Sequence, residues 1–167
     1  MIGEDTYAYR RYLPHLQKSG KTYFVTFCTR KREILSPNAR DIALACCLHD
    51  HRLAYWLDCA VVMPDHVHMI FTPYEQYTLA MIMNRVKDSS SHAITKVRGR
   101  GGHVWQREYF DRIVRASEDL RKKCEYVCEN PGRSGLGDDY RWIWRSWIEG
   151  AAEGGGAPLG EMENYPR

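Results

Sequence analysis

The feature that most constrains the fold is a strict alternation of side chains over residues 66–71, which read HVHMIF. Successive side chains of a β-strand point to opposite faces, so His66 and His68 share one face and three large apolar residues share the other. The apolar face has to lie beneath other elements, because burial stabilises such side chains. The pattern therefore predicts a strand with two imidazoles side by side on the face that the helices leave uncovered.

The segments around this strand are predicted to alternate between strands and helices. Their composition distinguishes them, because β-branched and aromatic residues favour strands whereas one-sided apolar stripes favour helices. The predicted strands are residues 22–29, 54–63, 66–73 and part of 103–115, and the predicted helices are residues 38–52, 78–97 and a third that follows Ser117. This order predicts an α+β, ferredoxin-like (RRM-like) antiparallel sheet with helices on one face and an added C-terminal helix.

Two details of the helices are also predicted. In the first helix, Ile42, Ala45 and Cys46 recur with helical spacing and are expected to face the core. Ser117 is expected to cap the third helix, because a side-chain oxygen at that position can accept from an orphan backbone N–H.

The composition favours one intracellular domain. A chain of 167 residues with 44% hydrophobic content can bury one compact core. It has neither an apolar run long enough to span a membrane nor a secretory signal, so the protein is expected to be soluble and cytoplasmic and without a membrane partner. Its six cysteines form no CxxC pair, which argues against disulfides and a zinc ribbon.

The charge is unevenly distributed along the chain. Residues 149–167 are acidic and Gly-rich and lack the apolar content to fold, so they are expected to be a flexible tail after a domain of residues 1–148. That domain holds 23 basic and 17 acidic residues, a net charge of +6. The excess modestly favours a polyanionic partner.

Two imidazoles on one rigid strand can begin a metal site. Neutral imidazole is a common metal ligand, and His66 and His68 are predicted to lie close enough to share one ion. The alternative is that a solvent-facing sheet surface simply tolerates polar residues, because an HxH pattern often arises by chance. The pair therefore needs support from the rest of the chain.

The predicted third helix carries a tyrosine away from its apolar stripe. That stripe runs from Leu120 to Cys128 at spacings of three and four, and Tyr126 lies roughly 120° from its centre. Asn130 follows one turn later on the same side, and a carboxamide oxygen can bind a hard cation. The alternatives are that Tyr126 is a half-buried aromatic and that Asn130 stops the helix before Pro131.

Several short motifs together resemble the REP-associated tyrosine transposases of the HUH superfamily, which are related to small insertion-sequence transposases. These motifs are Tyr9-Arg10-Arg11, Tyr23-Phe24-Val25-Thr26, Met63-Pro64-Asp65-His66-Val67-His68, Trp105-Gln106, and Tyr126 with Asn130-Pro131. They follow the family's order and approximate spacing over about residues 7–147, which is more specific than HxH alone. The chain departs from the family at Asp111-Arg112, where Asp-His is usual, so the role of Arg112 stays open.

The resemblance implies a metal-dependent endonuclease and strand transferase that acts on single-stranded DNA. It implies His66 and His68 as ligands of Mg²⁺ or Mn²⁺, with Asn130 as third ligand where related transposases use a glutamine. It implies Tyr126 as the nucleophile of a covalent 5′-phosphotyrosine intermediate. The implied partner is DNA with a REP-like hairpin, bound by a monomer or a homodimer.

The basic segments are expected to bind this DNA, with Arg10 and Arg11 beside the hairpin as the resemblance suggests. The predicted DNA-binding residues are Arg10, Arg11, Arg30, Lys31, Arg98, Arg100, Arg112, Arg115, Lys122 and Lys123. Trp105, Tyr109 or the aromatics of residues 140–147 are expected to stack on unpaired bases. The alternative is that the charge runs are solvated surface and the tryptophans are packing residues.

Two rival functions use the same fold. A non-catalytic module could bind single-stranded nucleic acid, although residues 66–72 lack the aromatic run of an RRM. A metal-dependent hydrolase could use activated water, with Tyr126 as a bystander. Covalent trapping of DNA on Tyr126 distinguishes the transposase from both.

Overall fold

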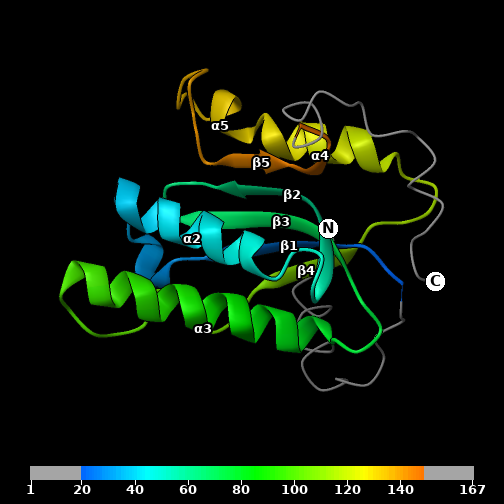
Figure 1. Ribbon diagram of the computed structural model, residues 1–167. Helices are drawn as coiled ribbons and strands as arrows, with labels where there is room; N and C mark the ends of the chain where they lie inside the picture. Colours follow the sequence, from blue (N-terminus) through cyan, green and yellow to red (C-terminus); the bar gives the residue numbers. More distant parts are fainter. Residues whose placement is uncertain (1–19, 149–167) are drawn as a thin grey trace.

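The computed structural model describes residues 20–148, in which five antiparallel strands form one sheet (Figure 1). The strands are β1 (Tyr23–Cys28), β2 (Tyr55–Val62), β3 (His66–Pro73), β4 (Phe110–Ile113) and β5 (Ile143–Arg145). The helices are α2 (Pro37–His49), α3 (Leu79–Arg98), α4 (Leu120–Cys128), α5 (Asn130–Arg133) and the 3₁₀ helix η1 (Arg30–Arg32). The strand order β4-β1-β3-β2-β5 places β3 at the centre, and the predicted α+β fold is confirmed.

Helices α2 and α3 cover one face of the sheet (Figure 1). The alternation of β3 directs Val67, Met69 and Phe71 into this layer, where all three are fully buried. They pack with Ile82 and Met83 of α3, as the apolar stripe of that helix predicts. The main core therefore lies on the side of β3 opposite the histidines.

The face that carries the histidines is partly covered, which corrects the expectation of a bare face. Ile70 shares this face with the imidazoles and is completely buried. The stripe of α4, formed by Cys124, Val127 and Cys128, packs in the same cluster as Ile70. A fully apolar side chain on this face needs cover, and α4 supplies it next to the imidazoles.

Helix α4 begins two residues later than the sequence predicts. Its N-cap is Asp119, whose Oδ1 accepts from the backbone N–H of Lys122 at 3.0 Å, and the assignment to Ser117 was wrong. Asp and Ser are both good N-caps, so sequence alone did not separate them. The carboxylate of Glu118 instead accepts from the backbone N–H of Arg115, which keeps the preceding residues in a turn.

The buried face of α2 also differs from the expectation. The buried residues are Ala39, Ala43 and Cys47, whereas Ala45 is exposed and Ile42 and Cys46 are only partly buried. Residues 42–48 are all apolar, so their spacing does not identify one face. Small side chains let the helix approach the sheet closely, and the larger ones pack at its flanks.

The end of the described chain adds a strand that the sequence did not predict. Trp144 of β5 lies opposite Ala60 of β2, so part of the aromatic segment forms an edge strand. Asn130 begins α5 rather than stopping a helix, because Glu129 is the C-cap of α4 and Pro131 suits a helix start. The predicted tail of residues 149–167 lies outside the described residues. Over residues 20–148, no helix combines the length and apolar character that crossing a membrane requires.

Candidate active site

His66 and His68 lie side by side on β3, facing the same side of the sheet as α4. Their Nε2 atoms are 3.2 Å apart, and their ring centroids are separated by 4.7 Å. The alternation of the strand thus produces the predicted pair, with both rings directed at a single point.

The Nδ1 atom of His66 is held by Asp65, the preceding residue. Nδ1 of His66 lies 2.7 Å from Oδ1 of Asp65, whose Oδ2 is 2.8 Å from Nε of Arg32. Burial raises the pKa of the Asp65 carboxyl, but the hydrogen bond from His66 and the charge of Arg32 outweigh burial and leave that pKa below its ordinary value. An ionised carboxylate only accepts, so Nδ1 carries the hydrogen and Nε2 of His66 presents a lone pair.

His68 is fixed by a neighbouring strand and kept neutral by its surroundings. Its Nδ1 lies 2.7 Å from Oγ1 of Thr26, the residue opposite it on β1, and its ring stacks on Phe24. Burial, assisted by the nearby charge of His66, lowers the pKa of His68 to about 3. At neutral pH this imidazole is therefore available as a ligand.

Asn130, at the start of α5, contacts the histidine pair and completes a cluster of three side chains. Its Nδ2 lies 2.9 Å from Nε2 of His68, 62 residues away in sequence. This contact makes Nε2 of His68 the acceptor, so its Nδ1 donates to Thr26. The amide oxygen and nitrogen of an asparagine exchange places on rotation of the amide, so the same position can also present an oxygen.

These three side chains fit a divalent ion. Two ligands at right angles, each about 2.1 Å from an octahedral ion, are about 3.0 Å apart, close to the 3.2 Å between the two Nε2 atoms. The two Nε2 atoms are close enough to bind one ion together when both lone pairs face it, an arrangement that a cation stabilises. Among residues 20–148, no three His, Cys, Asp or Glu side chains are grouped to hold an ion, so the amide of Asn130 is needed for a set of three protein ligands.

Tyr126 lies on the exposed side of α4, as its position off the apolar stripe predicts. Its side chain is 60% exposed, and the guanidinium carbon of Arg133 lies 3.9 Å from its ring centroid. Arg133 also donates to the backbone oxygen of Tyr126 at 2.7 Å. In the described part of the chain, the side chain of Tyr126 contacts Arg133 and makes no hydrogen bond to the histidines.

The helix nevertheless brings the tyrosine close to the cluster. Tyr126 lies in the last turn of α4, and Asn130 begins α5 directly after Glu129, the residue shared by the two helix ends. Asn130 in turn contacts His68 directly. Arg133 of α5 was not predicted as a site residue, because its contacts with Tyr126 form across the junction of two helices.

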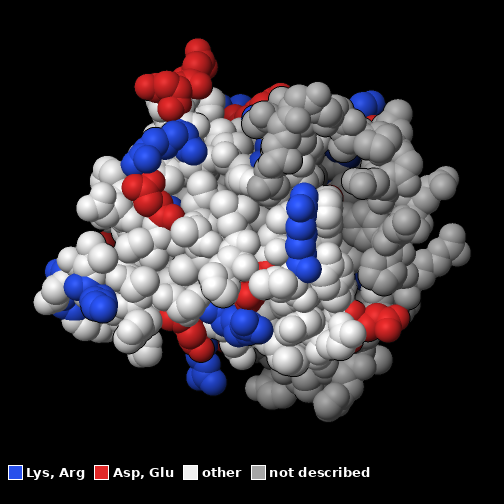
Figure 2. All heavy atoms as spheres, in the orientation of Figure 1, with Lys and Arg blue, Asp and Glu red and all other residues white. Residues whose placement is uncertain are grey.

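The predicted DNA-binding residues are distributed around the molecule. Arg112 forms a bidentate ion pair with Glu118, at 2.7 and 3.0 Å, and Lys123 lies over the ring of Phe24. Arg98 and Arg100 both pair with Glu33. The exposed members are Arg30, Lys31, Arg100, Arg115 and Lys122, whereas Arg10 and Arg11 lie outside the described residues. In the view of Figure 2, Lys and Arg are spread among acidic and uncharged residues and form no single basic patch in the part of this face that is described.

The predicted stacking residues are mostly engaged within the protein. Trp105 is 5% exposed and donates from Nε1 to Oγ of Ser90 at 2.9 Å, so the expectation that it stacks on DNA was wrong. Trp142 lies between the guanidiniums of Arg40 and Arg141, and Trp147 packs with Arg121. Trp142 and Trp147, which lie in the C-terminal segment, are half-buried, and so is Tyr109.

A histidine pair on the central strand of a ferredoxin-like sheet, next to a helix that carries a tyrosine, defines the class of single-tyrosine HUH transposases. Residues 17–130 match the sequence profile of the family described as "Transposase IS200 like". The match covers most of the chain, and the chain belongs to the IS200-like transposase family.

One of two similar solved structures supports the fold. A REP-associated tyrosine transposase bound to a REP hairpin is 21% identical, with a TM-score of 0.64 and coverage of 84% of each chain. A putative transposase from Deinococcus radiodurans R1 is 20% identical, with a TM-score of 0.46, and the match covers 70% of this chain and 94% of that one. A comparison with curated proteins gave no match.

Proposed function

We propose that this transposase is a metal-dependent endonuclease and strand transferase that cuts and rejoins single-stranded DNA beside a hairpin. The observation that carries the proposal is the contact between His66, His68 and Asn130, with Tyr126 in the last turn of the preceding helix α4. The REP hairpin bound to the structural neighbour supports a hairpin of this kind as substrate. The protein acts in the cytoplasm, associated with the nucleoid when bound to DNA.

His66, His68 and Asn130 hold Mg²⁺ or Mn²⁺ in this proposal. A bound divalent ion supplies Lewis-acid polarisation of a phosphate oxygen and orients the scissile bond. The residues around the site prepare the ligands, because Asp65 and Thr26 fix the two imidazoles with their lone pairs turned inward.

Tyr126 is the nucleophile. Its Oη attacks phosphorus, the Oη–P bond forms as the P–O3′ bond breaks, the phenolic proton passes to solvent, and the leaving oxygen is protonated to a 3′-hydroxyl. The 5′-phosphate stays on the tyrosine as an ester that conserves the energy of the broken bond. Attack by another 3′-hydroxyl on this ester releases Tyr126 and joins two strands without ATP. The guanidinium of Arg133 beside the ring contributes positive charge where phosphate binds.

The test is covalent trapping. The protein is incubated with Mn²⁺ and a hairpin oligonucleotide with single-stranded flanks labelled on the 3′ side of the cut, and the products are separated on a denaturing gel. We expect a labelled protein–DNA adduct that Tyr126→Phe abolishes. Tyr74→Phe is the matched control, because Tyr74 follows the far end of β3 and lies away from the histidines.

The alternatives give different products. Cleavage that persists in Tyr126→Phe indicates a hydrolase that uses water. Binding without cleavage or adduct in the wild-type protein indicates a non-catalytic module. Either result refutes the proposal.

A further inference from the structure

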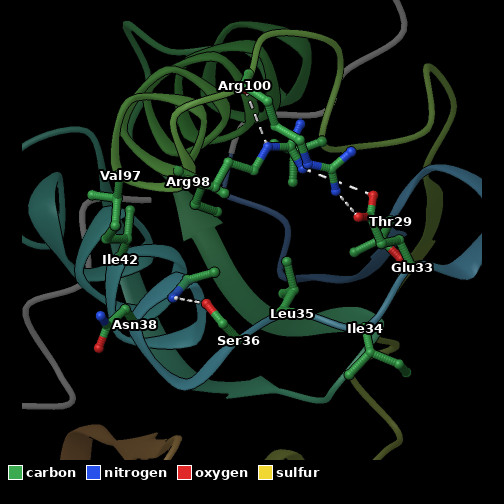
Figure 3. A pocket seen from close by; sticks show the side chains of 13 residues that line it. Thr29, Glu33, Ile34, Leu35, Ser36, Asn38, Ile42, Val97, Arg98 and Arg100 are labelled. Carbon is green, nitrogen blue, oxygen red and sulfur yellow. Dashed lines mark hydrogen bonds and ion pairs between the residues drawn. The ribbon is translucent and has the colours of Figure 1, made fainter.

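A cavity of about 330 Å³ lies on the far side of η1 from the histidines. Three segments form it: the chain from Thr29 to Leu35, the first turns of α2 and the last turn of α3 (Figure 3). Its size is in the range of small-ligand sites. Neither the metal cluster nor Tyr126 contributes to it.

The cavity combines an apolar wall with a cationic mouth. The apolar lining residues are Ile34, Leu35, Ala39, Ile42, Ile94, Val97 and Val104. Ile34 and Val97 are 65% and 60% exposed and so present apolar surface to a ligand in the cavity. Figure 3 shows Arg98 and Arg100 extending across the mouth toward Glu33, with which both form ion pairs. Two guanidiniums share one carboxylate, so the mouth keeps an excess positive charge.

Direct contacts connect the lining of the cavity with Asp65, the residue that holds His66. Thr29, which lines the cavity, donates to the backbone oxygen of Asp65 from its N–H at 2.9 Å and from its hydroxyl at 3.1 Å. Arg32 pairs with the same aspartate, and Glu33 next to it faces the cavity. Thr29, which lines the cavity, and His66 therefore both contact Asp65.

We propose that this cavity binds one unpaired nucleotide of the DNA strand held in the active site. The base lies against Ile34 and Val97, and the adjoining phosphate replaces Glu33 as the partner of Arg98 and Arg100. This inference rests on the proposed function, since it assigns a position to the same substrate. A nucleotide fits the lining because it joins a flat apolar surface to an anion, and guanidinium recognises phosphate with two hydrogen bonds.

The base contact is tested by fluorescence anisotropy with hairpin oligonucleotides that carry one abasic position at each flanking site in turn. Measurements use the full chain with Tyr126→Phe, which prevents cleavage. We expect one position at which the abasic change weakens binding about 5- to 100-fold, the range of a single stacked base. In the double variant Ile34→Ala and Val97→Ala, the intact oligonucleotide should lose a comparable factor, and the abasic one should bind as it does to the parent protein.

Leu53→Ala is the matched control, because Leu53 is also an exposed apolar residue, at 66%, and lies outside the cavity. It should leave both affinities unchanged. An abasic scan without a sensitive position overturns the inference, and so does a double variant that weakens both oligonucleotides equally.

The phosphate contact is tested by salt dependence. Each phosphate neutralised on single-stranded DNA contributes about −0.7 to the slope of log K against log salt. We expect Arg100→Gln to make the slope less steep by about 0.7, and an unchanged slope overturns this part of the inference. Formation of the Tyr126 adduct by the wild-type protein, measured separately, shows whether a negative result concerns the cavity alone or the whole function.

Discussion

Removal of the Asp65 carboxylate should weaken metal binding without unfolding the protein. Asp65 is not a proposed ligand, but its Oδ1 accepts from Nδ1 of His66 at 2.7 Å and so turns the lone pair of Nε2 toward the cluster. Replacement of such a partner typically costs a factor of about 10 to 100 in metal affinity, or about 1.4–2.7 kcal/mol. Asp65→Asn and Asp65→Ala should fall near the lower and upper ends of this range of lost metal affinity.

Asp65→Asn retains an oxygen that can accept from Nδ1 and loses the charge, so we expect a loss of about tenfold. Asp65→Ala removes the acceptor as well and frees the ring to rotate, so its loss should approach a hundredfold. Arg32→Gln keeps the carboxylate and removes its ion pair, at 2.8 Å, so its effect should be smaller than that of Asp65→Asn.

The assay is a titration with Mn²⁺ in which free ion is measured by its electron paramagnetic resonance signal, with circular dichroism as a check of folding. Asp88→Asn is the control, because Asp88 is an exposed residue of α3 and its substitution removes the same unit of charge. If the folded Asp65→Ala protein binds Mn²⁺ as tightly as the Asp88→Asn protein, the assignment of Asp65 as a positioning residue is wrong.

Three further predictions concern α4 and the turn that precedes it. Asp119→Ala should lower the free energy of unfolding by about 1 kcal/mol, and Ser117→Ala should leave it unchanged within ~0.3 kcal/mol, as measured by urea denaturation. The hydrogen bond from Arg112 holds the pKa of Glu118 at about 2, so this interaction stabilises the fold at neutral pH and is lost as the pH falls toward 2. In an NMR titration, Arg112→Ala should return that pKa toward its ordinary value, and no change would refute the pairing. Val127→Ala should cost about 1.5–2.5 kcal/mol in the same urea assay, because Val127 is buried between α4 and the sheet, and a cost near zero would contradict that packing.

The two elements that carry the candidate site residues, β3 and α4, were predictable because their apolar side chains recur with a clear period. Alternation on β3 separates His66 and His68 from the core side chains, and this holds wherever the strand lies in the sheet. The apolar stripe of α4 likewise leaves Tyr126 outside it, and the structure has that residue exposed. Asn130 was predicted by its helical spacing from Tyr126, and its contact with His68 agrees with a role in the same cluster.

The supporting contacts were not predictable, because they depend on how distant segments align. Thr26 reaches His68 through the register of β1 on β3, which no local pattern specifies. Trp105 has the composition of a stacking residue, but Ser90 in the middle of α3 gives its Nε1 a buried acceptor. A tryptophan satisfied in this way packs as a core residue.

The turn between β1 and α2 connects these observations. Lys31 and Arg32 have φ angles of 55° and 57°, in the left-handed region that costs a residue other than glycine about 1–2 kcal/mol. Two such residues in succession persist only where other contacts offset the strain, and strain of this kind concentrates at functional sites. Here the turn directs Arg32 to Asp65 on the side of the histidines, and the next residue, Glu33, to the cavity. A straighter connection would lose one of these two contacts, so the strained turn keeps a fixed separation between the histidine pair and the proposed nucleotide site.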